Sequence, residues 1–280
     1  MKIFCTLIFL FACRDIFPLT RISVKDALLK NLIDIRIRSR GGHTGNCIEM
    51  EVKNISYDTV FLRIEAGRVL IAGDSAFQNI LITGADSFFL TVGQTLKRDI
   101  FGMCMEMTDR SPVKDAKSTV GDMAGKALEA IARFIGKYNY YNGTGQHAVW
   151  VLSNNIPIES VHATDDPLVK DLHKLLHQVT GKPIPWYTLE YKQDTAHLFT
   201  GIPVKLFANF QYYLANNGLA SLILYDENNN IVQKLFLNLP HHPDDHEYVF
   251  VLDVSLWKRG SYFCKLFVDD RQQMVREINL

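Results

Sequence analysis

The residues of this chain that most invite chemistry are a cysteine and a glutamine. Cys104 lies in the segment FGMCMEM, and Gln146 stands at the head of the apolar run QHAVWVL, directly before His147. A cysteine thiol that loses its proton attacks carbonyl carbons. A carboxamide offers such a carbon, and its nitrogen can leave as ammonia. Histidine titrates near neutral pH, so we expect His147 to be able to carry the proton.

The pattern Gln-x-Ala-Val-Trp at residues 146–150 resembles the Thr-Gln-x-Ala-Ile-Trp motif of bacterial surface thioester domains. In that family the glutamine side chain is bonded to a cysteine that lies on a strand. The order here is similar: a cysteine strand, a helix and then the glutamine helix. Gly145 stands where the family has threonine. The resemblance implies an internal thioester between Cys104 and Gln146, which an amine on a target surface opens to form a covalent bond.

Three other interpretations of the same residues stay open. Gln146 can play a structural part by bonding the free backbone amides at the N-terminus of its helix. Cys47 can pair with Cys104 in a disulfide, which would exclude a thioester. A Cys104–His147 hydrolase dyad is the third, although the sequence offers neither an orienting partner nor a Gly-rich oxyanion segment. The sequence therefore leaves enzymatic activity open and favours a binding protein.

The N-terminus has the pattern of an export signal. Met1 and Lys2 precede the apolar run IFCTLIFLFA, which is too short to span a bilayer and is typical of a signal-peptide core. We predict a signal peptide over residues 1–20. The segment LFAC resembles a bacterial lipoprotein processing box, which implies a lipid anchor at Cys13. The predicted location is the cell surface, the outer membrane or the periplasm.

Composition and charge narrow the class of partner. The chain has 30 basic and 30 acidic residues, so no overall field attracts nucleic acid. The segment HHPDDH, residues 241–246, is rich in metal-ligating side chains, but it has the composition of a solvated hairpin loop and matches no known ligand spacing. We predict no metal and no cofactor. The expected partner is a protein or another surface ligand.

Hydrophobic periodicity divides the mature chain into three parts. Alternating apolar and polar residues predict strands in an N-terminal β-sandwich over residues 21–112. Helical spacing follows over residues 113–182, with Asp122 as a cap, Met123 in the first helix and Gly181 at the exit of the last. We expect this helical segment to pack on the sandwich.

The remaining chain returns to the β pattern. Two prolines in KPIPWYTLE predict an extended linker over residues 183–195, and residues 196–280 read as an Ig-like β-sandwich. Its KRGSYFCKLFVDDRQQMVREINL ending resembles C-terminal Ig-like domains of secreted bacterial proteins, including type IX sorting domains. The predicted fold is mainly β with a helical segment. The predicted function is an exported bacterial binding or adhesion protein.

Overall fold

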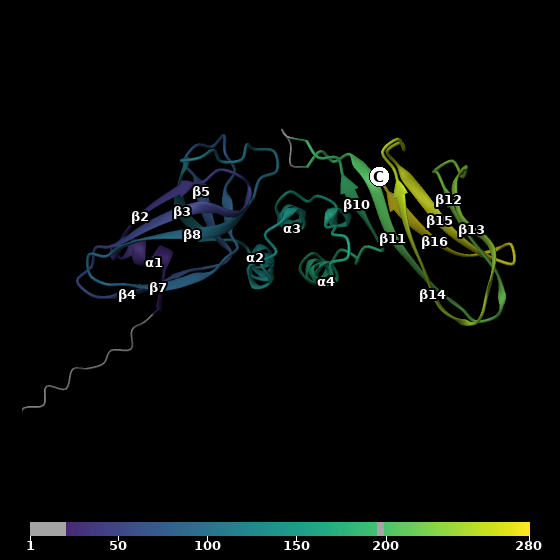
Figure 1. The fold of residues 1–280 in the computed structure, drawn as a ribbon, viewed down its shortest axis with the longest axis horizontal. Helices are drawn as coiled ribbons and strands as arrows, with labels where there is room; N and C mark the ends of the chain where they lie inside the picture. Colours follow the sequence, from purple (N-terminus) through teal and green to yellow (C-terminus); the bar gives the residue numbers. More distant parts are fainter. Residues whose placement is uncertain (1–20, 195–198) are drawn as a thin grey trace, which may run out of the picture.

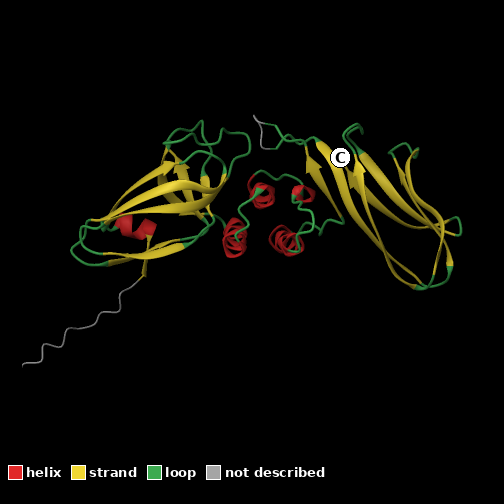
Figure 2. Ribbon diagram, in the orientation of Figure 1, coloured by secondary structure: helices red, strands yellow, loops and turns green. Residues whose placement is uncertain are grey.

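A computed structural model describes residues 21–194 and 199–280. The chain forms an N-terminal β body, a group of helices and a C-terminal β-sandwich, which follow one another in a row (Figures 1 and 2). The predicted fold, mainly β with a helical segment and a C-terminal sandwich, is confirmed. The predicted signal peptide and Cys13 lie outside the described residues.

The N-terminal body is built around a closed barrel. Its strands, in barrel order, are β2 (Ile33–Ser39), β3 (Thr44–Asn54), β8 (Thr95–Cys104), β6 (Ile80–Ile82), β5 (Arg68–Ala72) and β9 (Lys117–Met123). A separate sheet of β1 (Arg21–Ser23), β4 (Val60–Ile64) and β7 (Asp86–Leu90) accompanies the short helix α1 (Val24–Leu29). Closure pairs the strand edges of the barrel with one another. The strands of the predicted N-terminal β-sandwich over residues 21–112 are therefore arranged as a closed barrel with an added sheet.

The barrel is closed by a strand that we expected to be helical. Residues 117–123, within the predicted helical segment 113–182, form β9, which pairs with both β2 and β5. Asp122 and Met123 are therefore strand residues. Thr119 and Val120 are β-branched and favour strands. The helical periodicity of the following residues masked this short strand.

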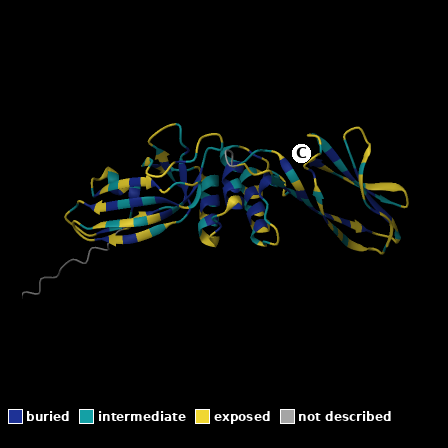
Figure 3. Cartoon of the chain, turned by 45° about the horizontal axis from the view of Figure 1, so that its top comes forward, coloured by how far each residue is buried: buried dark blue, intermediate teal, exposed yellow. Residues whose placement is uncertain are grey.

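Three helices follow the barrel. They are α2 (Lys126–Tyr138), α3 (Gly143–Ser153) and α4 (Leu168–Thr180), with a 3-10 turn at Ile158–Ser160 between the last two. The helix α4 ends at Gly181, whose φ of 71° satisfies the left-handed C-cap, as predicted. The helix α3 is buried on most of its surface (Figure 3). Among the described residues, no helix is long and apolar enough to cross a membrane.

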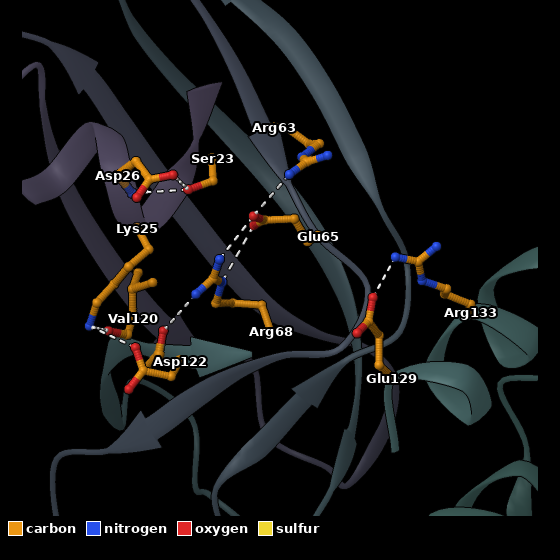
Figure 4. Close-up of polar contacts among 11 residues, drawn as sticks. Ser23, Lys25, Asp26, Arg63, Glu65, Arg68, Val120, Asp122, Glu129 and Arg133 are labelled. Atoms are coloured by element: carbon orange, nitrogen blue, oxygen red, sulfur yellow. Dashed lines mark hydrogen bonds and ion pairs between the residues drawn. The ribbon is translucent and has the colours of Figure 1, made fainter. Parts of the chain in front are cut away.

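A buried arginine ties the barrel strands together near α2 (Figure 4). Arg68 is 5% exposed, and its Nη2 lies 2.9 Å from Oε1 of Glu65. Its Nη1 donates to the carbonyl of Gly121 in β9 at 3.1 Å. A buried guanidinium is costly without such partners. Next to it, Gly67 has a φ of 92°, and a Cβ there would meet the Cγ of Glu129 on α2 at 2.8 Å. This glycine therefore lets the helix approach the barrel.

The C-terminal part is a two-sheet sandwich of the Ig-like kind. One sheet has the order β10 (Tyr187–Tyr191), β11 (Pro203–Leu214), β14 (Asp244–Asp253). The other has the order β13 (Ile231–His241), β12 (Gly218–Tyr225), β15 (Ser261–Val268), β16 (Arg271–Asn279). The inward side chains of the two sheets, among them Phe210, Leu222 and Leu266, form one core.

The predicted linker over residues 183–195 contains part of this sandwich. Residues Tyr187–Tyr191 form β10, which pairs antiparallel with β11. The hydroxyl of Tyr187 accepts the N–H of Asn279 at 2.9 Å, and Nε1 of Trp186 donates to the carbonyl of Glu277 at 3.1 Å. The prolines favoured an extended chain, but the alternation within YTLEY is what makes it a strand. The sandwich thus begins before residue 196.

This boundary can be checked with two fragments. Residues 183–280 should melt cooperatively as a β protein, whereas residues 199–280 lack β10. Loss of buried Tyr187 and Leu189 should lower the free energy of unfolding by about 3–6 kcal/mol or prevent folding. Urea unfolding followed by circular dichroism measures this. Equal stability of the two fragments would contradict the assignment of β10 to the sandwich.

Candidate functional site

The helix that carries the glutamine is fixed at its N-terminus by local bonds. Asn142 is the N-cap of α3, and its Oδ1 accepts the N–H of Gly145 at 3.0 Å. Gly145 lies against the preceding chain, since a Cβ there would be 2.2 Å from the carbonyl oxygen of Tyr140. This contact gives a physical reason for glycine at the position where the thioester family has threonine.

Gln146 lies directly against Cys104. The Oε1 of Gln146 accepts the backbone N–H of Cys104 at 3.0 Å, and its Nε2 donates to the backbone carbonyl of Cys104 at 2.7 Å. The same N–H also lies 3.1 Å from the carbonyl of His43. Both side chains are almost fully buried, at 1% and 0% exposure. The carboxamide therefore pairs with the end of β8 as a neighbouring strand would, and it does not bond the free amides of its own helix.

The thiols near this pair are free. Cys104 and Cys47 are both buried, and neither forms a disulfide, so the Cys47–Cys104 alternative is not what the structure has. Burial raises the pKa of Cys47 to about 11. It raises the pKa of Cys104 further, with added repulsion from Cys47 and Glu106. Both thiols are therefore protonated at neutral pH.

The described contacts of His147 are with a backbone carbonyl and two aromatic rings. Its Nδ1 lies 2.7 Å from the carbonyl oxygen of Ser160, and its ring contacts Trp150 and Phe199. A carbonyl only accepts, so Nδ1 carries the proton and Nε2 keeps a lone pair. Burial lowers the pKa of His147, which keeps the ring neutral at pH 7. The structure thus brings Cys104 and Gln146 together, while the described contacts of His147 do not form a hydrolase dyad with Cys104.

A pocket of about 380 Å³ opens beside this pair. Its walls come from the first turns of α3, from a loop of the barrel and from the end of β10. The lining residues include Gln146, His147, Trp150, His43, His162 and Glu190. Cys104 is not among the residues that line it. Of this pair, therefore, only Gln146 borders the pocket.

The wall of the pocket is held by a segment that sequence reasoning missed. The carbonyls of residues 160–162 each accept a side-chain hydrogen bond. The donors are His147 to Ser160 at 2.7 Å, His173 Nε2 to Val161 at 2.8 Å and Thr144 to His162 at 2.6 Å. His173 lies on the apolar face of α4 beside Leu172 and Leu176. A histidine at an apolar position of a helical pattern is the sequence signal that could have identified this contact.

The histidine-rich segment 241–246 has protein partners. Nε2 of His241 lies 2.8 Å from the hydroxyl of Tyr212, and Nε2 of His246 lies 2.8 Å from the carbonyl of His242. Within residues 21–194 and 199–280, no group of three or more His, Cys, Asp or Glu side chains is arranged to hold a metal ion. The segment joins β13 to β14, which belong to different sheets of the sandwich. It is therefore a connection between sheets, and not the hairpin loop that its composition suggested.

Comparison of the chain with protein-family models, with curated proteins and with solved structures gave no match.

The close approach of α3 to Tyr140 gives a test by substitution. Gly145→Ala places a methyl group against the Tyr140 carbonyl and should lower the free energy of unfolding by about 1–3 kcal/mol. Gly143→Ala, in the same helical turn, is the matched control, because nothing lies within 4 Å of its Cβ. It should be neutral or slightly stabilising. Chemical denaturation of both variants gives the comparison, and equal losses would contradict the packing of α3.

The buried histidines predict acid sensitivity. Burial lowers the folded-state pKa of His147 and His173 below the ordinary value of 6.5. Below pH 6.5 the unfolded chain binds more protons, so the free energy of unfolding should fall as the pH drops through the folded pKa values. Above pH 6.5 these groups should add no pH dependence. Urea unfolding as a function of pH measures the slope. His173→Gln cannot titrate there and should show a shallower slope; an unchanged slope would contradict this role.

Proposed function

We propose that this chain is an exported bacterial surface or periplasmic binding protein that carries an internal thioester between Cys104 and Gln146 and captures amines. One observation supports the proposal most. Two residues singled out by type and motif, 42 positions apart, have their carboxamide and backbone in direct contact in a buried site.

The arrangement suits formation of the bond. The Cys104 sulfur attacks Cδ of Gln146, and negative charge develops on Oε1. The Cys104 N–H already lies 3.0 Å from that oxygen and would stabilise the charge, as an oxyanion-hole donor does. The carbon–nitrogen bond then breaks, and the nitrogen takes the thiol proton and leaves as ammonia. The products are one thioester and one ammonia per chain, so the step occurs once.

The surroundings of the thioester would protect it from water and would give an amine access to it. Burial excludes water from the sulfur, and Gln146 borders the pocket while Cys104 does not. An amine in the pocket attacks Cδ, forms an amide with Gln146 and releases Cys104 as a thiol. His147, neutral and with a free Nε2, lines the same pocket and can take the proton of the amine. A protein that forms a covalent bond to its target needs few copies to hold a cell.

Export and display are proposed from the sequence. The apolar run behind Lys2 supports a leader, and Cys13 supports a lipid anchor. The C-terminal sandwich then serves as a spacer or sorting domain, as the resemblance of its last strands to secreted bacterial domains suggests. In that arrangement the barrel and helices are the part that meets the target.

A second candidate is a binding module without covalent chemistry. Both polar atoms of the Gln146 carboxamide have partners on the Cys104 backbone, which favours this candidate. The two hydrogen bonds alone would hold α3 on β8. The chain would then bind its ligand through surface contacts only.

Intact mass of the purified protein separates the two candidates. A thioester makes the chain about 17 Da lighter than its sequence, because one ammonia has left the carboxamide. Methylamine should open it, add its mass less ammonia at Gln146 and expose Cys104 to alkylation. Gln146→Ala and Cys104→Ala should each abolish the deficit and the adduct.

Cys47→Ala is the matched control, because Cys47 is a second buried free thiol close to the same strand end. That variant should keep both the deficit and the adduct. The non-covalent candidate predicts full mass and no adduct. It also predicts that Gln146→Ala lowers the free energy of unfolding by about 1–3 kcal/mol, since two hydrogen bonds are lost. Full mass of the wild-type chain would refute the thioester.

A further inference from the structure

The C-terminal sandwich contributes a carboxylate to the pocket that reaches Gln146. Glu190 lies on β10, and it lines this pocket together with Gln146 and His147. These residues come from two different parts of the chain, the helices and the sandwich. The pocket is therefore complete only when the two parts are joined.

The strand is irregular at this point. Glu190 pairs with Lys205 and Tyr191 pairs with Pro203, so Val204 is an extra residue in β11. Such bulges change strand twist locally and are frequent next to functional sites. The Nζ of Lys205 lies 3.3 Å from Oε2 of Glu190, but both side chains are about half exposed. An exposed ion pair of this kind contributes little, so the Glu190 carboxylate can exchange its partner for a bound cation.

The described residues that line the pocket include two carboxylates. They belong to Glu190 and Asp194, and Lys192 is the cationic residue that lines the pocket with them. The histidines of the pocket, His43, His147 and His162, each have a pKa lowered by burial and are neutral at pH 7. Lys205 balances Glu190 in its ion pair, so the pocket favours a cation where that cation replaces Lys205 beside this carboxylate. The aromatic rings of Trp150 and Tyr191 also line the pocket, and aromatic rings attract ammonium groups.

We propose that Glu190 selects cationic alkylamines, the class to which the lysine side chain belongs, as the nucleophiles that reach Gln146. This inference rests on the proposed thioester. An alkylamine is a cation at neutral pH, so the carboxylate concentrates it beside the carbonyl carbon. Glu190 is thus a specificity-determining residue that the C-terminal sandwich supplies to a site built on the helices.

The reaction balances with the groups present. The bound ammonium gives one proton to Nε2 of His147 and becomes a free amine. The amine attacks Cδ of Gln146, the carbon–nitrogen bond forms, and the bond from Cδ to the Cys104 sulfur breaks. The sulfur takes a proton from solvent, His147 returns its proton to solvent, and the second proton of the former ammonium also passes to solvent. The products are a secondary amide on Gln146, a Cys104 thiol and one released proton.

The test compares two nucleophiles of similar size on the full chain. Methylamine is cationic at neutral pH, whereas methoxyamine is uncharged there. Adduct formation is followed by intact mass over time. Glu190→Gln should slow the reaction with methylamine about tenfold, the loss expected for one removed charge contact, and leave methoxyamine unchanged. Lys205→Met frees the carboxylate from its ion pair and should speed the methylamine reaction only.

Glu247→Gln is the matched control, because Glu247 lies on β14 of the same sheet and does not line the pocket. It should react as the wild type does with both nucleophiles. Added salt should slow the wild-type reaction with methylamine and not that with methoxyamine. This measurement needs no variant to fold.

The outcomes distinguish the two proposals. A wild-type chain at full mass that gives no adduct refutes the thioester itself. A wild-type chain that reacts, with Glu190→Gln slowing both nucleophiles equally or neither, refutes the role of Glu190 and leaves the thioester standing. Absence of any salt effect on methylamine would likewise overturn it.

Discussion

The pairing of the Gln146 carboxamide with the backbone of Cys104 is the contact on which the centre of this molecule depends. The β3–β8 ladder ends where Thr44 pairs with Met103. One residue further along, the buried N–H of Cys104 lies 3.1 Å from the carbonyl of His43 and 3.0 Å from Oε1 of Gln146. The carbonyl of Cys104 accepts Nε2 of Gln146. One side chain thus continues the ladder and fixes the position of α3 on the barrel.

The remaining contacts of α3 also hold this helix in its position on the barrel. Asn142 caps its start, Gly145 lets it approach Tyr140, and Thr144 and His147 hold the carbonyls of residues 160 and 162. That segment leads through α4 to β10 and so to the pocket wall that carries Glu190. The site is therefore positioned by side-chain hydrogen bonds to the backbone of irregular segments.

The difference between regular strand patterns and tertiary contacts explains which parts of the structure the sequence could predict. Regular alternation predicted most barrel strands and the C-terminal sandwich, and the motif singled out Cys104 and Gln146 before their contact was known. The short strands β9 and β10 were missed, because each borders a stronger pattern: helical spacing after Gly125 and prolines before Trp186. The bonds of residues 160–162 have no sequence period, since a carbonyl's partner depends on tertiary packing. His173 and Glu190 were overlooked for the same reason.

The burial of Cys104 has opposite effects on the two halves of the proposed chemistry. A raised pKa leaves little thiolate, so formation of the thioester is slow and must rely on the close contact with Gln146. After an amine has reacted, the sulfur returns to the same buried surroundings and is protonated again. A neutral thiol is a poor nucleophile toward the new amide, and an amide is a far less reactive carbonyl than a thioester. The burial that slows formation therefore also makes capture effectively irreversible, which is what an anchoring protein requires.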